Sequence, residues 1–278
     1  MLWVSLKKEY LKKQKIMNKI KKIIHYSDLH LKLYKQHTRD KKVLEKALIE
    51  WKKIKPDRIV FTGDLVHSKN QMTPELINLM SWWFNETSKI CKCVYIIGNH
   101  DFLENNMDRM DALSPVINGL NNSNIVYYKD MGCYDDENII WCVYSLTNHN
   151  IRPEIPEESK KLKIGLFHGP IEGSSNDFGF VFDEGYSIDR FIGCDVVLAG
   201  DIHKRQRFNI PGGGKIYMVG STIIQNFGES IKNHGYGVYN VETNKYRSYN
   251  LENTQPYLNF KITDIEDINK EKEILING

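Results

Sequence analysis

Short apolar segments that end in polar residues recur along the chain. Five of them have the length and composition of β-strands, namely residues 23–26, 58–61, 94–97, 163–166 and 196–199. Between the first three, apolar residues at helical spacing predict one helix over about residues 40–53 and another from Pro74 to about Lys89. This order of strand, helix, strand, helix and strand predicts a sheet with crossover helices packed on it.

The pattern changes after Ile125, where most apolar segments are short and are separated by turns that contain Gly, Asn or Pro. We expect a second, largely antiparallel sheet from the segments 125–128, 139–144, 163–167, 196–199, 216–219, 237–241 and 245–251. The predicted fold class is α/β, a four-layer αββα sandwich of two mixed sheets flanked by helices. Residues 148–161 are predicted to form a surface loop.

The two ends of the chain differ from this central region. The first 22 residues contain eight lysines and one glutamate, which predicts a basic N-terminal extension over residues 1–22. A solvated charge run and a contact to a phosphate backbone both remain open for it. Residues 23–252 form the predicted main domain, and residues 253–278 are either a tail or the start of a truncated capping domain.

Composition adds bounds on the class of protein. The chain has 278 residues, of which 41% are hydrophobic and 26% charged, as in ordinary globular proteins. No apolar run approaches the roughly 20 residues that span a bilayer, and no signal-peptide core follows the N-terminus. The five cysteines form no C-x-x-C pair, which favours reduced thiols. We therefore expect a soluble, cytoplasmic protein without membrane contacts. The net charge of +3 neither requires nor excludes nucleic acid.

Candidate chemistry is concentrated in five polar runs that directly follow strand-like segments. They are Ser27-Asp28-Leu29-His30, Gly63-Asp64-Leu65-Val66-His67, Gly98-Asn99-His100-Asp101, Phe167-His168-Gly169 and Gly200-Asp201-Ile202-His203. Open α/β sheets place active sites at the carboxyl ends of their strands. Two divalent cations about 3.5–4 Å apart need a bridging carboxylate together with imidazole, amide and carboxylate ligands. A single histidine at a strand end is usually structural, but five such runs in order predict a two-metal phosphoesterase site.

These runs resemble those of the calcineurin-like metallophosphoesterase family over about residues 24–240. The resemblance implies that Asp28, His30 and His203 bind one metal. It implies that Asn99, His168 and Asp201 bind the other, with Asp64 as the bridge. The mixed donor set favours Mn²⁺, with Mg²⁺ or Fe²⁺ as alternatives. Residues 23–252 would then be the catalytic domain.

The resemblance also assigns residues to catalysis. It implies that His100 contacts the scissile phosphate and protonates the leaving oxygen, a task suited to an imidazole. Asp101 either orients His100 or simply closes the turn. The last run departs from the family's usual Gly-His-x-His, because Asp201 replaces the first histidine. The added negative charge should weaken phosphate attraction and strengthen the preference for hard metals.

Further features resemble the SbcD-type nuclease subunits within this family, a pattern shared by viral and phage recombination endonuclease subunits. They are His67, three residues after Asp64, and the order of residues 200–206, 219–222, 226–229 and 234–238. The resemblance implies a DNA endonuclease or exonuclease of recombination and repair, with an SbcC-type ATPase subunit as partner. His67 would lie near the scissile phosphate. Lys204, Arg205 and Arg207 are either contacts to the DNA backbone or an ordinary basic hairpin.

Two other classes of function stay open at this stage. The same metal motifs serve small-molecule phosphatases and cyclic-nucleotide phosphodiesterases. A non-catalytic scaffold with a metal site degraded at Asp201 is the second alternative. The adjacent Trp82 and Trp83 cannot both face the core from one helix, so one of them lies either on a homodimer surface or against a neighbouring loop.

Overall fold

The computed structural model of the chain describes residues 19–253 except 33, 107 and 149–150. Most of the predicted basic extension and nearly all of the predicted tail or capping domain, residues 1–18 and 254–278, lie outside the described residues. In the part of the chain that the structure describes, no helix has the length and apolar content needed to cross a bilayer.

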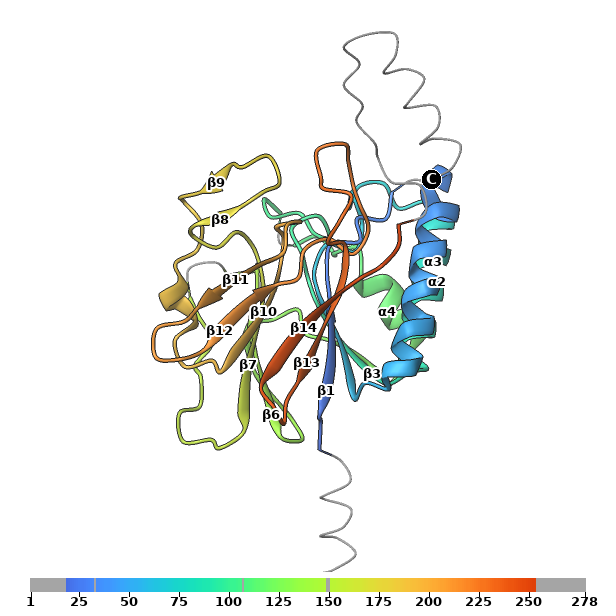
Figure 1. Cartoon of the computed structure of the whole chain (residues 1–278). Helices are drawn as coiled ribbons and strands as arrows, with labels where there is room; N and C mark the ends of the chain where they lie inside the picture. Colours follow the sequence, from blue (N-terminus) through green and yellow to red (C-terminus); the bar gives the residue numbers. More distant parts are fainter. Residues whose placement is uncertain (1–18, 33, 107, 149–150, 254–278) are drawn as a thin grey trace, which may run out of the picture.

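The first sheet has six strands in the order β14-β13-β1-β2-β3-β4. Their bounds are β1 Lys22–Tyr26, β2 Arg58–Thr62, β3 Lys92–Ile96, β4 Ile125–Tyr127, β13 Gly235–Asn240 and β14 Lys245–Asn250. The strands β1 to β4 are parallel, whereas β13 runs antiparallel to both β1 and β14. Helices α2 (His37–Ile54), α3 (Pro74–Ser88) and α4 (Ser114–Leu120) lie on one side of the molecule, next to this sheet (Figure 1).

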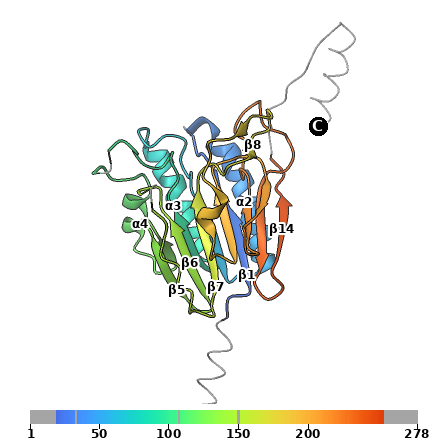
Figure 2. The ribbon, with the colours of Figure 1, turned by 90° about the vertical axis from the view of Figure 1, so that its left-hand side faces the viewer.

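The second sheet also has six strands, in the order β11-β12-β10-β7-β6-β5, and Figure 2 views the molecule from its side. Their bounds are β5 Gly132–Asp136, β6 Ile139–Tyr144, β7 Leu162–His168, β10 Val196–Gly200, β11 Gln206–Asn209 and β12 Lys215–Met218. A short hairpin, β8 Ser174–Ser175 and β9 Val181–Phe182, and the 3₁₀ helices η1 (Tyr34–Gln36) and η2 (Ile188–Phe191) complete the elements.

The predicted fold class is confirmed, because two mixed sheets face each other, with α-helices outside the first and the 3₁₀ helix η2 outside the second. The prediction of a largely antiparallel second sheet is wrong, since β6, β7, β10 and β12 are parallel to one another and only β5 and β11 run against them. The segments β4, β13 and β14 join the first sheet instead. Long connections between β6, β7 and β10 allow parallel pairing, which needs a crossover of a dozen or more residues.

Each sheet buries both of its faces, as alternation along β1 illustrates. Ile24 and Tyr26 point into the cluster under the helices, which also contains Trp51 and Trp83. Ile23 points the other way, into the cluster between the two sheets. A third apolar cluster covers the outer face of the second sheet and includes Phe191 of η2. Among the described residues this outer layer holds no α-helix, so the fourth layer of the sandwich is thin.

The two main helices begin and end where their sequences indicate. Pro74 opens α3 after Thr73, whose hydroxyl accepts a hydrogen bond from the Leu76 amide at 3.3 Å. Trp83 is fully buried, whereas Trp82 is half-buried with the Lys41 ammonium 4.9 Å from its ring centre. Trp82 thus contacts helix α2 and not a neighbouring loop, and the homodimer surface stays a prediction.

An ion pair between Arg58 of β2 and Asp136 of β5 ties the two sheets together. The guanidinium donates two hydrogen bonds at 2.7 and 2.6 Å, and Trp141 Nε1 donates a third at 3.0 Å. Burial alone would raise the pKa of Asp136, but the hydrogen bonds from Arg58 and Trp141 outweigh it and lower that pKa. The carboxylate is therefore ionised and fully partnered at neutral pH.

Replacing Asp136 with asparagine should lower the free energy of unfolding by about 2–4 kcal/mol at pH 7, because the buried Arg58 loses its counter-charge. A carboxylate with a lowered folded-state pKa stabilises above its unfolded pKa of about 3.9. The difference between wild type and variant should therefore shrink as the pH falls below about 4. Urea unfolding at several pH values measures this. Asp135→Asn is the control, since Asp135 is 69% exposed in its pair with Lys161, and a comparable loss there would refute the assignment.

Candidate metal centre and active site

All five polar runs lie at the carboxyl ends of strands, as predicted. Asp28 and His30 follow β1, Asp64 follows β2, and Asn99 and His100 follow β3 in the first sheet. His168 ends β7, and Asp201 and His203 follow β10 in the second sheet. The two sheets thus deliver their polar groups to one shared edge.

Four of these residues have a left-handed backbone, although none is glycine. The φ angles are 53° for Asp28, 43° for His30, 62° for Asp64 and 90° for Asp201. Such conformations cost a non-glycine residue on the order of 1–3 kcal/mol each and concentrate at functional sites. Backbone hydrogen bonds hold them in place, from Asp28 N to Gly63 O at 3.1 Å and from His30 N to Asp64 O at 3.0 Å. Because of these turns, side chains two residues apart in one loop, such as Asp28 and His30, point toward the same place.

Asp64 lies between two groups of donor atoms. Its Oδ2 is 3.4 Å from His30 Nε2 and 3.4 Å from His168 Nε2. On one side His30 Nε2 lies 3.0 Å from His203 Nε2 and 3.8 Å from Asp28 Oδ1. A carboxylate between two imidazole groups is the arrangement that a bridging ligand requires.

The other side of Asp64 holds His168, Asn99 and Asp201. His168 Nε2 is 3.0 Å from Asn99 Oδ1 and 3.6 Å from Asp201 Oδ1. His168 Nδ1 lies 2.6 Å from the Thr62 carbonyl and must donate to it, so the ring, if it bound a metal, would be neutral with the lone pair of Nε2 toward these oxygens. Asn99 Oδ1 then faces only acceptors. If the Asn99 amide rotated, its nitrogen would donate to His168 and Asp64. If a cation were bound, Asn99 Oδ1 could keep its present direction, because the oxygen and its acceptor neighbours would all face the cation.

A carboxylate fixes the orientation of His203 in a similar way. Glu229 Oε1 accepts from His203 Nδ1 at 2.6 Å, which leaves Nε2 to face the cluster. Burial opposes protonation of His203, but the hydrogen bond to Glu229 and the charge of Asp28 outweigh it and raise the pKa to about 9. Such carboxylate–histidine pairs orient metal-binding imidazoles. Side-chain geometry would allow an ion among Asp28, His30 and His203, among Asp28, Asp64 and His168, and among His30, His67 and His100.

The pKa values of the clustered carboxylates also favour a bound cation. Burial raises the pKa of Asp28, and it raises that of Asp201 to about 6. For Asp64, burial is outweighed by the attraction of His168, which lowers the pKa. Bringing three carboxylates together out of water is unfavourable unless positive charge accompanies them. The donor chemistry therefore fits divalent cations.

His67 and His100 lie beside this cluster. The His100 ring centre is 4.7 Å from that of His30 and 5.8 Å from that of His67. His100 Nδ1 donates to the His67 carbonyl at 2.7 Å, so Nε2 is the atom left to meet a ligand. Both rings line a cavity of about 220 Å³ over the cluster, together with Lys32, Asp64 and Asp201.

Asp101 does not orient His100, and of its two predicted roles the structure shows the turn. Its carboxylate accepts from the backbone amides of Asp64, Leu65 and Val66 at 2.9–3.1 Å, and from that of Gly98 at 3.0 Å. A side chain at Gly98 would collide with Asp64, so only glycine allows the two loops to approach this closely. Asp101 thus locks the loop of the candidate bridge to the loop after β3.

The three predicted substrate-binding residues separate in space. Lys204 borders a cavity that also contains Asp201 and His203, and its ammonium donates to Ser175 Oγ at 3.0 Å. Arg205 instead donates to the carbonyls of Val219 and Tyr249 and holds β14 in place. Arg207 is exposed on β11 and lines a different cavity. Arg205 and Arg207 therefore lie outside the candidate substrate site.

Glu229 and Lys32 were missed as functional candidates. Glu229 belongs to residues 226–229, whose order in the chain alone gives this residue no role. An acidic residue shortly after a Gly-Ser turn is the sequence feature that could have identified it. Lys32 follows the first polar run directly, and its ammonium donates to the Gln225 carbonyl at 2.9 Å across the cavity.

This site and fold define the class of protein as a metal-dependent phosphoester hydrolase. The family model described as calcineurin-like phosphoesterase matches residues 21–205, and the chain belongs to this family.

Proteins similar to the chain include one viral relative and two solved structures. The chain is 32% identical over 262 residues to an uncharacterized protein of Acanthamoeba polyphaga mimivirus, with 88% of this chain and 19% of that protein aligned. It thus spans about a fifth of that relative's length. The TT1561 protein of Thermus thermophilus shares the fold, with a TM-score of 0.55 at 13% identity over 84% of this chain and 99% of that one. A dimetal phosphatase from Danio rerio has a TM-score of 0.47 at 10% identity, covering 80% and 92%.

Proposed function

We propose that this chain is an SbcD-type DNA nuclease that hydrolyses phosphodiester bonds with two divalent metal ions. Its proposed partners are DNA, an SbcC-type ATPase subunit and a second copy of the chain, and its proposed role is in recombination and repair. The observation that carries the proposal is the pair His67 and His100, which lie together over the donor cluster and are not among the ligands assigned here to either ion.

The metal ligands belong to the same proposal. Asp28, His30 and His203 would hold one ion, Asn99, His168 and Asp201 the other, with Asp64 shared. When bound, the ions would acidify a water molecule and neutralise charge on the phosphoryl oxygens. Three carboxylates and an amide oxygen are hard donors, so Mn²⁺ is favoured, with Mg²⁺ or Fe²⁺ as alternatives.

The histidines over the cluster would handle the substrate. The His67 carbonyl holds Nδ1 of His100 in its donor state, which leaves Nε2 to contact the scissile phosphate and to pass a proton to the leaving oxygen. The His67 ring would hold the strand beside it. One histidine for proton transfer and another for holding the strand would suit a substrate that must be positioned before it reacts.

Exposed aromatic rings beside the cluster support a polymeric substrate. Phe178 is 77% exposed and borders the cavity that contains Asp201, His203 and Lys204. Phe227 is 56% exposed, next to Asn226 of the same cavity. Base stacking on such rings is worth about 1–3 kcal/mol per base. A small phosphate ester would leave them unused, which favours a nuclease over a small-molecule phosphatase.

His67→Ala should separate these two functions. We expect DNA degradation with Mn²⁺ to fall about tenfold or more, while hydrolysis of bis(p-nitrophenyl) phosphate changes less than about threefold, because only the polymer must be held in place. Asn70→Ala, an exposed change in the same loop, is the control. Equal losses on both substrates would favour the phosphatase, and a wild-type protein that leaves DNA intact would refute the nuclease.

A further inference from the structure

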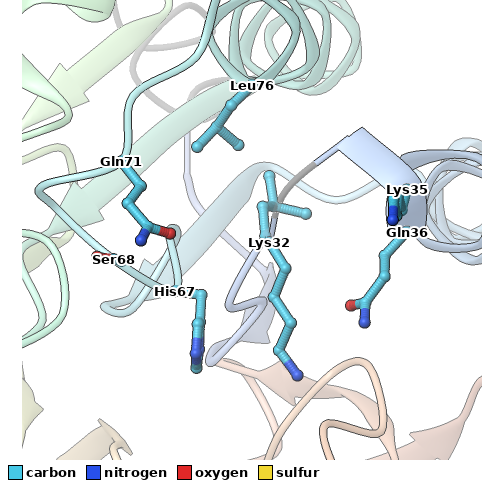
Figure 3. Close-up of a pocket in the computed structure, with 8 residues that line it drawn as sticks. Lys32, Lys35, Gln36, His67, Ser68, Gln71 and Leu76 are labelled. Carbon is cyan, nitrogen blue, oxygen red and sulfur yellow. The ribbon is translucent and has the colours of Figure 1, made fainter.

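A second cavity, of about 300 Å³, adjoins the cavity over the cluster (Figure 3). Its lining residues come from the loop after β1 and the 3₁₀ helix η1, and from the loop after β2 and the first turn of α3. We propose that this cavity binds the nucleoside next to the scissile phosphate, an inference that rests on the proposed nuclease function.

The position of the cavity limits what can occupy it during the reaction. Lys32 and His67 line both this cavity and the one over the cluster. The His67 ring centre is 6.0 Å from that of His30 and 5.8 Å from that of His100. A group that enters here would therefore lie next to a phosphate held at the cluster. In a nucleic acid, that group is the adjoining sugar and its base.

The lining matches a base better than it matches a phosphate. Leu31 and Leu76 are among the lining residues, so one part of the cavity wall is apolar. Gln71 adds an amide, a group that hydrogen-bonds base edges, and Lys35 adds an ammonium. Gln36 also lines the cavity, where its Oε1 accepts a hydrogen bond from Arg39 at 3.4 Å. Figure 3 shows the polar ends of Lys32, Gln36 and His67 turned to one side, with Leu76 at the opposite side. A site for phosphate alone would not need the leucines, whereas a base has both an apolar face and a polar edge.

The size of the cavity has a consequence for the form of the substrate. A volume of about 300 Å³ is at the lower end for small-molecule sites and suits one nucleoside, not a base pair. The base must therefore leave its partner before it enters. Because unpairing costs a few kcal/mol and is least costly in single strands, we expect unpaired or frayed DNA to be cleaved faster than paired duplex.

Binding of small anions tests the cavity without relying on catalysis. We expect the Mn²⁺-loaded protein to bind thymidine 5′-monophosphate about tenfold more tightly than inorganic phosphate by isothermal titration calorimetry. Gln71→Ala and Lys35→Ala should each reduce that preference about threefold and leave phosphate affinity unchanged. The matched controls are Asn70→Ala and Lys42→Ala, both exposed and both outside the lining. No preference for the nucleotide, or equal effects of Lys35→Ala and Lys42→Ala, would overturn the inference.

A cavity-filling variant tests the same site in the reaction. Ser68→Tyr should lower kcat/KM about tenfold for thymidine 5′-(p-nitrophenyl phosphate), and less than about twofold for bis(p-nitrophenyl) phosphate, which carries no nucleoside. Equal losses on the two esters would overturn the subsite. If the protein prefers the nucleotide through Gln71 and Lys35 but does not cleave DNA, the nuclease proposal fails and the nucleoside site stands.

Discussion

Replacing Asp64 should abolish hydrolysis and metal-dependent stabilisation together. Its Oδ2 is equally distant from His30 and His168, so its loss removes the group that both ions would share. We expect activity below about a hundredth of wild type. The stabilisation by saturating Mn²⁺, about 2.7 kcal/mol at a hundredfold excess over Kd, should disappear as well. Activity assays and thermal unfolding with Mn²⁺ or chelator measure both quantities.

The choice of variant matters because Asp64 has a left-handed backbone. Alanine would add strain there, whereas asparagine tolerates this conformation. Asp64→Asn also keeps an oxygen that can accept from the His100 amide, which lies 2.8 Å from Asp64 Oδ1. Asp183→Ala, at an exposed position directly after β9, is the surface control. If Asp64→Asn retains more than about a tenth of the activity, Asp64 is not the bridge.

Replacing His100 with alanine should give a different result, a large loss of turnover with near-normal metal content. A positioned proton donor is usually worth about 10²–10⁴-fold. Because the donor acts on the leaving group, the loss should be larger for DNA than for p-nitrophenyl esters, whose leaving group needs no proton. Rates on both substrates and metal content by mass spectrometry measure this. Loss of bound metal would make His100 a ligand instead.

The sequence predicted the positions of the candidate ligands because their signals are local. Only a few consecutive residues are needed to recognise a strand that is followed directly by Asp28 and His30, or by Asn99. Parallel strands then place their carboxyl ends, and these residues, side by side. The helices α2 and α3 were predictable for the same reason, since apolar spacing and Pro74 are local features. The strands β5 and β11 and the short helix α4 carry weaker patterns and were not predicted.

What could not be predicted depends on contacts between distant residues. The direction of strand pairing in the second sheet is set by crossovers, not by the composition of the strands. Asp101 resembles a catalytic partner in sequence because it follows His100. Its actual partners are backbone amides such as that of Leu65, 36 residues earlier. Arg205 likewise resembles a phosphate contact, but its guanidinium binds carbonyls of β14 and the loop after β12.

The division of the donor cluster between two sheets has a consequence for folding. Each proposed ion would take ligands from both halves, one from Asp28, His30 and His203, the other from Asn99, His168 and Asp201. The ions would therefore act as cross-links across the seam and join the sheets into one cooperative unit. Without them, the seam would be held by apolar packing and pairs such as Arg58 and Asp136. Metal supply would then set how long the folded chain survives as well as how fast it works.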